Sequence, residues 1–364
     1  MRFLIFTKTD WAEPPRLRHQ LSRLLADAGH EVIFFELPFY PWQAANRLQS
    51  GHPRISLRQY RHLLHHKLRL FPTLQILNAR YEIRQIKRSV RDLRVYDNDV
   101  VVNFNYDYFF LRDLFPRQRL ITLINDDFWS RAIWGFERPL KWALGRTCKS
   151  SDMVLAVSPT LVEQLKPYCS PQLFYPWADI PYKPPYIGIE RSTLLYWGYI
   201  GEKIDFDYVK TLACLAKNLK PAVRLAFVGP VQGNLEKLVD LVRSNDIDYY
   251  TELDASELQL HEVFGAIIPY QKNVPSIDVI TMPNKALQLL CRGVPLLITG
   301  MPNFIRNPAV FRLGLGEEVD SSTIATVRQN FYQLQPEIMA FLRDHSAAQR
   351  LHYFLRQIEN LCAA

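Results

Sequence analysis

Two successive runs of short apolar segments, alternating with helical patterns, constrain the fold of this chain more than any other feature. Short segments that are apolar on both faces are typical of parallel strands buried between layers of helices. The first half has the candidate strands RFLIF (2–6), EVIFFE (31–36), DVVVNF (99–104), LITLIN (120–125), MVLAVS (153–158) and QLFYP (172–176). The second half has TLLYWG (193–198), VRLAFVG (223–229), IDYYTEL (247–253), GAIIPY (265–270) and VPLLIT (294–299).

The order of these segments predicts an α/β protein with two doubly wound, Rossmann-like domains. Residues 16–30 have apolar side chains at helical spacing between the first two strands, which makes a βαβ unit. A chain of 364 residues is also long for a single core. We expect a first domain over 1–185 that ends in a proline-rich linker, a second over 186–320, and C-terminal helices over 321–364 that pack across the domains.

The charge of the chain is unevenly distributed. Of the net +8, the residues up to Pro185 contribute 27 Lys and Arg against 17 Asp and Glu, whereas the residues from Tyr186 onward contribute 17 against 19. The excess is concentrated in 54–94, which holds 11 Lys and Arg with only Glu82 and Asp92 as acids. Such a segment suits nucleic acid, acidic phospholipid or a diphosphate-linked substrate, unless it is only a solvated basic surface.

The cysteines and the apolar segments of the chain indicate in which cellular compartment the protein is expected. The five cysteines are scattered and none has CxxC spacing, so the sequence predicts neither a disulfide framework nor a zinc site and indicates a reducing compartment. The opening MRFLIF is too short for the apolar region of a signal peptide, and no apolar run approaches the length of a membrane span. We therefore expect a cytoplasmic protein.

Four places in the second domain have residues suited to an anionic ligand. Gly198 and Gly229 end candidate strands, where small residues let backbone amides approach an anion, and Lys203 follows the first of them. Tyr270 stands at the end of another strand, where the ligand crevice of an open sheet is expected. Ordinary tight turns and aromatic packing are the alternatives for these residues.

The fourth place is MPNKALQLLCRGVP (282–295), which predicts a short helix that ends before Gly293. Lys285 and Gln288 are three residues apart and therefore share one helix face. A lysine in the first turn is unfavourable for the helix dipole, and a bound anion would offset this. The pattern favours a phosphate-binding lysine over a solvated one.

The first domain has acids and a polar loop after its strands. Asp126 and Asp127 follow a buried strand, where one could act as a general base and the other could cap the next helix. Asp127 is slightly favoured as the base because it lies farther past the strand. The loop after the first strand, 7–19, offers a set of acceptor-binding candidates: Asp10, Trp11, Arg16 and His19.

In this order the motifs resemble the second domain of a GT-B glycosyltransferase. The matching residues are Gly198-Tyr199-Ile200 with Lys203 and Asp205, Val228-Gly229-Pro230, Pro269-Tyr270, and Pro283-Asn284-Lys285 through Gly293-Val-Pro295. Many members of the largest retaining family have Glu where Gln288 stands, and a second Glu where Ile280 stands. The spacing of Tyr270, Lys285 and Gln288 is instead similar to that of the inverting β-glucuronosyltransferases of exopolysaccharide assembly, of the xanthan type.

The resemblance implies two domains that face a cleft, a UDP-sugar donor and no metal or other cofactor. It implies that Tyr270, Lys285 and Gln288 contact the nucleotide, with Asn284 in place of a methionine near the base ring, and that Asp126 or Asp127 is the base. The acceptor would be a glycan or a lipid-diphosphate-linked glycan. Since the sequence predicts no membrane span, we expect 54–94 to hold the chain peripherally on the anionic inner face of the plasma membrane.

Two rival interpretations remain open at this point. Asp205 and Asp207 could be the metal-binding acids of a one-domain, metal-dependent glycosyltransferase, although helix capping at a predicted helix start explains them better. A basic nucleic-acid-binding protein is the non-enzymatic alternative. The basic segment lacks the glycine-rich aromatic pattern of an RNA-recognition motif, so we expect no nucleic acid partner.

Overall fold

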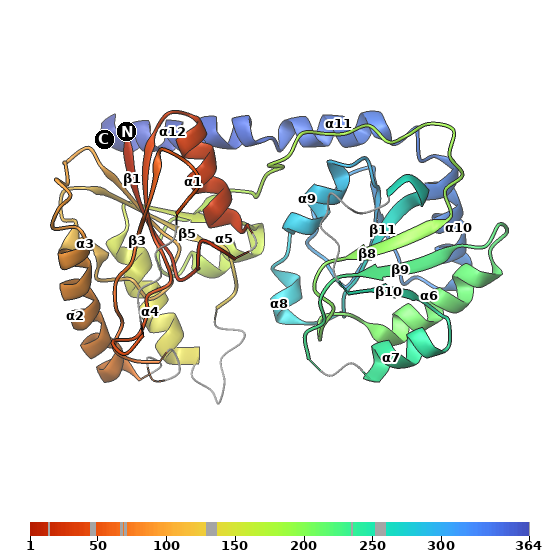
Figure 1. Cartoon of the computed structure of the whole chain (residues 1–364), viewed down its shortest axis with the longest axis horizontal. Helices are drawn as coiled ribbons and strands as arrows, with labels where there is room; N and C mark the ends of the chain where they lie inside the picture. Colours follow the sequence, from red (N-terminus) through yellow and green to blue (C-terminus); the bar gives the residue numbers. More distant parts are fainter. Residues whose placement is uncertain are drawn as a thin grey trace. The chain divides into compact units, whose positions relative to one another are not determined.

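The chain forms two compact α/β units in a computed structural model that describes residues 1–13, 15–43, 49–65, 68, 71–128, 137–233, 236–251 and 260–363. One unit comprises Met1–Tyr175 with Ala347–Ala364, and the other comprises Pro176–Ser346. Each unit is a parallel sheet with helices on it (Figure 1). This is the fold class that the alternating apolar segments predicted.

The first unit has a seven-stranded parallel sheet with the strand order β3-β2-β1-β4-β5-β6-β7. The strands are β1 (Arg2–Phe6), β2 (Glu31–Phe35), β3 (Ile55–Arg58), β4 (Val100–Asn103), β5 (Arg119–Ile124), β6 (Met153–Ala156) and β7 (Gln172–Leu173). The helices are α1 (Leu17–Asp27), α2 (Pro72–Ser89), α3 (Leu111–Leu114), α4 (Glu137–Ser150), α5 (Pro159–Leu165) and α12 (Ala347–Ala363).

The second unit has a six-stranded parallel sheet with the order β10-β9-β8-β11-β12-β13. The strands are β8 (Thr193–Trp197), β9 (Arg224–Val228), β10 (Asp248–Tyr250), β11 (Val263–Pro269), β12 (Leu296–Thr299) and β13 (Val310–Arg312). Its helices are α6 (Phe206–Asn218), α7 (Glu236–Arg243), α8 (Pro275–Asp278), α9 (Asn284–Leu290), α10 (Glu317–Gln329) and α11 (Gln335–Asp344), with a 3₁₀ turn at Leu260–Glu262.

Both sheets reverse their strand order beside the first strand of the unit. The chain moves outward from β1 to β3, then returns to place β4 on the other side of β1. In the same way β8 lies between β9 and β11. In open α/β sheets ligands bind at the carboxyl ends of the strands at this reversal. A ligand site is therefore expected at the loops after β1 and β4 in the first unit and at those after β8 and β11 in the second.

The second unit begins at Pro176 rather than at the expected residue 186. The proline-rich stretch packs on this unit: Trp177 is buried, Ala178 donates its backbone N–H to the His345 carbonyl at 2.9 Å, and Lys183 donates to the Cys291 carbonyl at 2.7 Å. These contacts lie within the second unit, to which the stretch therefore belongs.

The last helix, α12, belongs to the first unit, whereas α10 and α11 belong to the second. Phe354 of α12 is buried, with its ring 6.3 Å from that of Phe3 and 5.7 Å from that of Phe174. Figure 1 shows α12 beside α1, close to both chain ends. No helix within the described ranges is long and apolar enough to cross a membrane.

Candidate functional site

The loops that follow β8, β9 and β11 are bound to one another at the reversal point of the second sheet. The backbone N–H of Ile200 donates to the Pro230 carbonyl at 3.0 Å, which joins the loops after β8 and β9. The N–H of Asp205 donates to the Pro269 carbonyl at 2.8 Å, and that of Gln271 donates to the Lys203 carbonyl at 2.9 Å. These bonds fix the positions of the candidate donor-binding residues.

Two glycines permit this close approach. Gly229 has φ +140°, and a Cβ atom there would collide with the backbone carbonyl of Gly198. Gly198 has φ +125°, and its Cβ would lie 3.2 Å from the Lys285 ammonium. Any side chain at Gly229 would separate the two loops, and one at Gly198 would press on Lys285, so both positions require glycine.

Lys285, on α9, extends toward the ends of β8 and β11. Its ammonium donates to the Tyr196 hydroxyl at 2.9 Å and lies 4.4 Å from the Tyr196 ring centroid and 5.2 Å from that of Tyr270. Over the described ranges no carboxylate forms an ion pair with it. Burial, and then the nearby Lys203 ammonium, lower the pKa of Lys285 to about 7. A buried ammonium whose charge is disfavoured by burial and by a second cation would be stabilised by a bound anion.

The two tyrosines shape the surroundings of this ammonium. Burial raises the pKa of Tyr270 to about 12 and raises that of Tyr196 well above its usual value, so both hydroxyls stay protonated at neutral pH. Tyr196 donates to the Tyr199 carbonyl at 2.5 Å, and the Tyr270 carbonyl accepts from Thr299 Oγ1 at 2.9 Å. The Tyr199 side chain is exposed. The rings therefore offer the lysine a neutral, π-rich environment that does not cancel its charge.

The remaining candidates on α9 are Asn284 and Gln288, and both side chains are partly buried. Neither makes a side-chain hydrogen bond within the described part of the chain. The helix ends as predicted: Gly293, with φ +71°, donates its N–H to the Leu290 carbonyl at 2.8 Å, and β12 begins at Leu296. Asn284, Lys285 and Gln288 thus share one short helix, and of these three only Lys285 has a side-chain hydrogen bond to another side chain within the described residues.

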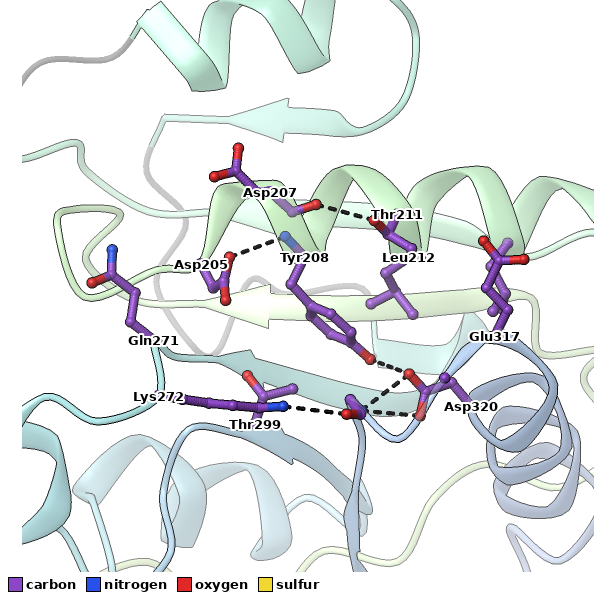
Figure 2. A pocket seen from close by; sticks show the side chains of 13 residues that line it. Asp205, Asp207, Tyr208, Thr211, Leu212, Gln271, Lys272, Thr299, Glu317 and Asp320 are labelled. Atoms are coloured by element: carbon purple, nitrogen blue, oxygen red, sulfur yellow. Dashed lines mark hydrogen bonds between the residues drawn. The ribbon is translucent and has the colours of Figure 1, made fainter.

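A pocket of about 540 Å³ adjoins these loops between α6 and α10, and it contains the two acids of the metal interpretation (Figure 2). Asp205 accepts from the Tyr208 N–H at 3.0 Å, which confirms its capping role. Asp207 pairs with Lys237 at 3.0 Å. No group of three or more His, Cys, Asp or Glu suited to a metal occurs among the described residues. Both acids of the metal interpretation therefore have partners within the second unit.

In the first unit Asp126 and Asp127 follow β5, as the sequence predicted. Asp126 is partly exposed, and its carboxylate accepts from the Asp127 N–H at 2.9 Å. Asp127 is only 2% exposed. The Asp126 carboxylate also acts on Arg18, whose pKa is lowered to about 10 by burial and then by Arg16. Asp126 is therefore the more accessible of the two acids.

The loop after β1 contains the acceptor-binding candidates, and the structure divides them into two pairs. His19 is fully buried: its Nδ1 accepts from the Arg16 N–H at 3.0 Å and its Nε2 faces the Asp10 carbonyl at 3.1 Å. Trp11 is buried too, with its indole N–H donated to the Ser50 carbonyl. These two rings pack inside the unit and are not presented to a ligand, whereas Asp10 is partly exposed and Arg16 is exposed.

Sequence reasoning missed an ion pair at the reversal point of the first sheet. Lys8, after β1, lies 2.5 Å from the Asp107 carboxylate, after β4, and 4.8 Å from the Tyr108 ring centroid. It also missed Tyr196, which reads as a core aromatic of β8. The sequence could have indicated this ion pair, because the polar segments TKT (7–9) and NYD (105–107) directly follow two apolar candidate strands.

Comparisons with known proteins agree with this architecture. Residues 16–173 match the model of Glycosyltransferase Family 4. A search of curated proteins finds no match. Sucrose-phosphate synthase from Thermosynechococcus elongatus superimposes with a TM-score of 0.68 at 13% identity, over 99% of each chain. HepE of Anabaena, solved in complex with UDP-glucose, gives 0.66 at 11% identity, over 99% of this chain and 100% of the other. The lipopolysaccharide galactosyltransferase WaaB gives 0.64 at 11% identity, over 99% of each chain.

These likenesses span both units, whereas the family match lies in the first. The chain has the two-unit GT-B fold of these glycosyltransferases, and its residues 16–173 carry the Glycosyltransferase Family 4 pattern.

Proposed function

We propose that the chain is a glycosyltransferase that moves a sugar from a nucleotide donor to a hydroxyl group of a glycan or lipid-linked acceptor. The observation that carries this proposal is Lys285, a partly buried ammonium beside Lys203 and over two tyrosine rings, with no carboxylate paired to it in the described ranges. A diphosphate would supply the missing negative charge. The fold and the family match support the reaction class.

We propose UDP as the nucleotide of the donor. HepE, with the same fold, was solved with UDP-glucose. Lys285 would neutralise the diphosphate, Gln288 one turn further would hold the ribose or uracil, and Tyr270 and Asn284 would border the base. The lysines would stabilise the leaving UDP in place of a metal ion, so we expect turnover to survive EDTA.

For the chemical step we propose an aspartate of the first unit as the general base. It would take the proton of the acceptor hydroxyl as that oxygen bonds to the anomeric carbon and the bond to the UDP oxygen breaks, which inverts the anomeric configuration. Asp126 is favoured by its exposure, and Asp127 is the alternative. The anomeric configuration of the product, read by NMR coupling constants, tests this step.

The donor is tested by titration. Tryptophan fluorescence should report saturable binding of UDP, and a panel of UDP-, GDP- and ADP-sugars should yield turnover with one nucleotide class. Glucuronosyl transfer in exopolysaccharide synthesis, as in the xanthan-type enzymes, is the specific form we propose. If none of these nucleotides binds, the proposed function is wrong.

We also propose that the first unit binds the anionic surface of a membrane on its cytoplasmic side. On α2 and the residues beside it, Phe71, Ile76 and Leu77 are exposed apolar side chains. The same segment exposes a series of basic side chains: Arg80, Arg84, Lys87, Arg88 and Arg91. Exposed apolar and basic residues on one helix are the combination that an interfacial helix needs. A lipid-diphosphate-linked acceptor would be met at this surface.

A further inference from the structure

Tyr196 of β8 presents its hydroxyl to Lys285 from a fixed place in the core of the second unit. The side chain is fully buried, and its ring stacks on that of Phe227 with centroids 5.0 Å apart and an interplanar angle of 21°. Its strand, β8, lies between β9 and β11 inside the sheet. Close-packed rings in a sheet core have little freedom to move, so the hydroxyl at the end of this ring has a defined position.

The Tyr196 hydroxyl makes two hydrogen bonds whose directions are set by its chemistry. It has one hydrogen atom, which it donates to the Tyr199 carbonyl at 2.5 Å, and its oxygen accepts from the Lys285 ammonium at 2.9 Å. Tyr199 belongs to the loop after β8, the loop that also contains Lys203. The hydroxyl therefore joins the lysine side chain of α9 to the backbone of the loop that carries the second cation.

These contacts restrict a side chain that is flexible by nature. The four-carbon stem of a lysine loses conformational entropy when a ligand fixes it, unless the protein has fixed it beforehand. Here Nζ and Cε of Lys285 lie 3.2 and 3.3 Å from the position that a Cβ atom at Gly198 would take, and the ammonium lies 4.4 Å from the Tyr196 ring centroid. An ammonium has three N–H donors, so the bond to Tyr196 leaves two for an anion.

We infer that the Tyr196 hydroxyl is a positioning group, which holds the Lys285 ammonium in the orientation in which its other N–H groups meet the donor diphosphate. The inference rests on the proposed function, because that function assigns the diphosphate to Lys285. In this role Tyr196 acts only through the lysine. Its effect on donor binding should therefore disappear when the ammonium is absent.

A double-mutant cycle on the full chain, with UDP as the probe in calorimetric titration, tests this role. Tyr196→Phe keeps the buried ring and removes only the hydroxyl. It should raise the Kd of UDP about tenfold, the effect of one lost hydrogen bond to a charged group. In a Lys285→Met background the same change should alter the Kd by no more than about twofold. Tyr332→Phe is the matched control, because that hydroxyl donates to another backbone carbonyl of the second unit, that of Tyr186, at 2.9 Å.

The pH profile of UDP binding is a second readout, which a loss of stability alone would not move. Burial and then Lys203 lower the pKa of Lys285, whereas the hydroxyl oxygen of Tyr196 favours the ammonium form. Tyr270, which is neutral, is the other titratable side chain that faces this ammonium among the described residues. Removing the hydroxyl should lower the pKa of Lys285 further. UDP affinity should therefore begin to fall at a lower pH in Tyr196→Phe than in the parent.

Three results would overturn the inference: a UDP affinity in Tyr196→Phe equal to or above that of the parent, the same loss of affinity in the Lys285→Met background, or an equal loss in Tyr332→Phe. Unfolding temperatures check that every variant folds, and Phe at position 196 retains the ring contacts of the core. The parent keeps the two proposals apart. If UDP binds the parent and Tyr196→Phe alike, only the positioning role is rejected, whereas a parent that does not bind UDP rejects the proposed function.

Discussion

The Lys285 ammonium donates a 2.9 Å hydrogen bond to Tyr196, a residue 89 positions earlier in the chain, and lies over the ring of the same tyrosine. A neutral hydroxyl and a π face bring no negative charge to this ammonium, so its protonated form can still pair with an anion. This relationship places a positive charge at the reversal point of the second sheet and is the basis of the first two predictions.

Replacing Lys285 by alanine should weaken UDP binding. Loss of one charge-assisted contact costs about 1.5–3 kcal/mol, which is roughly a 10- to 150-fold rise in Kd. Calorimetric titration measures this directly. Lys272→Ala is the matched control, since Lys272 is an exposed lysine of the same unit that donates to the Gly314 carbonyl. Equal UDP affinity in the Lys285 variant and the parent would refute the phosphate role.

Binding of a UDP-sugar should weaken as pH rises above neutrality. The pKa of Lys285 is about 7 in the free protein, and a bound diphosphate would raise it, because the anion stabilises the ammonium. The complex then holds more protons than the free protein above this pKa, so affinity should fall roughly tenfold between pH 7 and pH 8.5 and level off below pH 6. In Lys285→Met the same titration should be nearly flat. A flat profile in the parent as well would exclude Lys285 as the titrating group.

Gly229→Ala should destabilise the second unit and impair the donor site. The new Cβ would meet the Gly198 carbonyl at a backbone φ of +140°, and such strain costs about 1–3 kcal/mol. Gly233→Ala is the matched control: Gly233 also has positive φ, +98°, but among the described residues no atom beyond its chain neighbours lies within 4 Å of its Cβ position. Chemical denaturation measures both variants. If the two lose stability equally, the cost comes from φ alone and the contact between the loops is unimportant.

The sequence allowed the strands to be predicted where both faces are buried. The candidate segments 2–6, 31–36 and 193–198 coincide with β1, β2 and β8, because a continuous apolar run is what a central parallel strand requires. The strands β3 and β13 were missed. Each lies at one edge of its sheet. Only Ile55 of β3 is buried, and the residues of β13 are partly or fully exposed, so both strands lack that run.

The candidate sites were predictable only in part. Lys285 was recognised from its place on a helix, but its tyrosine surroundings depend on contacts between β8 and α9 that no local pattern contains. His19 and Trp11 were expected to face a ligand, yet a polar atom on an aromatic ring is often satisfied inside the unit, as here. A pocket of about 460 Å³ lined by Asp10, Glu36 and Gln59 is formed by three loops distant in sequence, and periodicity carries no information about it.

Replacing the catalytic base by asparagine should abolish most turnover while leaving the donor site intact. A lost general base costs roughly 100-fold or more in kcat. We expect this of Asp126→Asn, because Asp126 is the more exposed acid, with UDP affinity unchanged. Asp127→Asn should mainly lower the unfolding temperature, since that side chain is buried. Near-full activity in both variants would move the base elsewhere, with Asp10 the next candidate.

Vesicle binding should depend on charge and on the exposed face of α2. Each basic residue near an anionic leaflet contributes about 1 kcal/mol, so a handful together gives reversible binding. Co-sedimentation with phosphatidylglycerol-containing vesicles should be clear at low salt and fall as salt screens the charges. The quadruple change of Arg84, Lys87, Arg88 and Arg91 to Gln should weaken it strongly. A matched quadruple change on the second unit, Lys210, Lys217, Lys220 and Lys237 to Gln, should leave it intact. Binding that is equal on neutral and anionic vesicles, or absent from both, would show that this basic surface is only solvated.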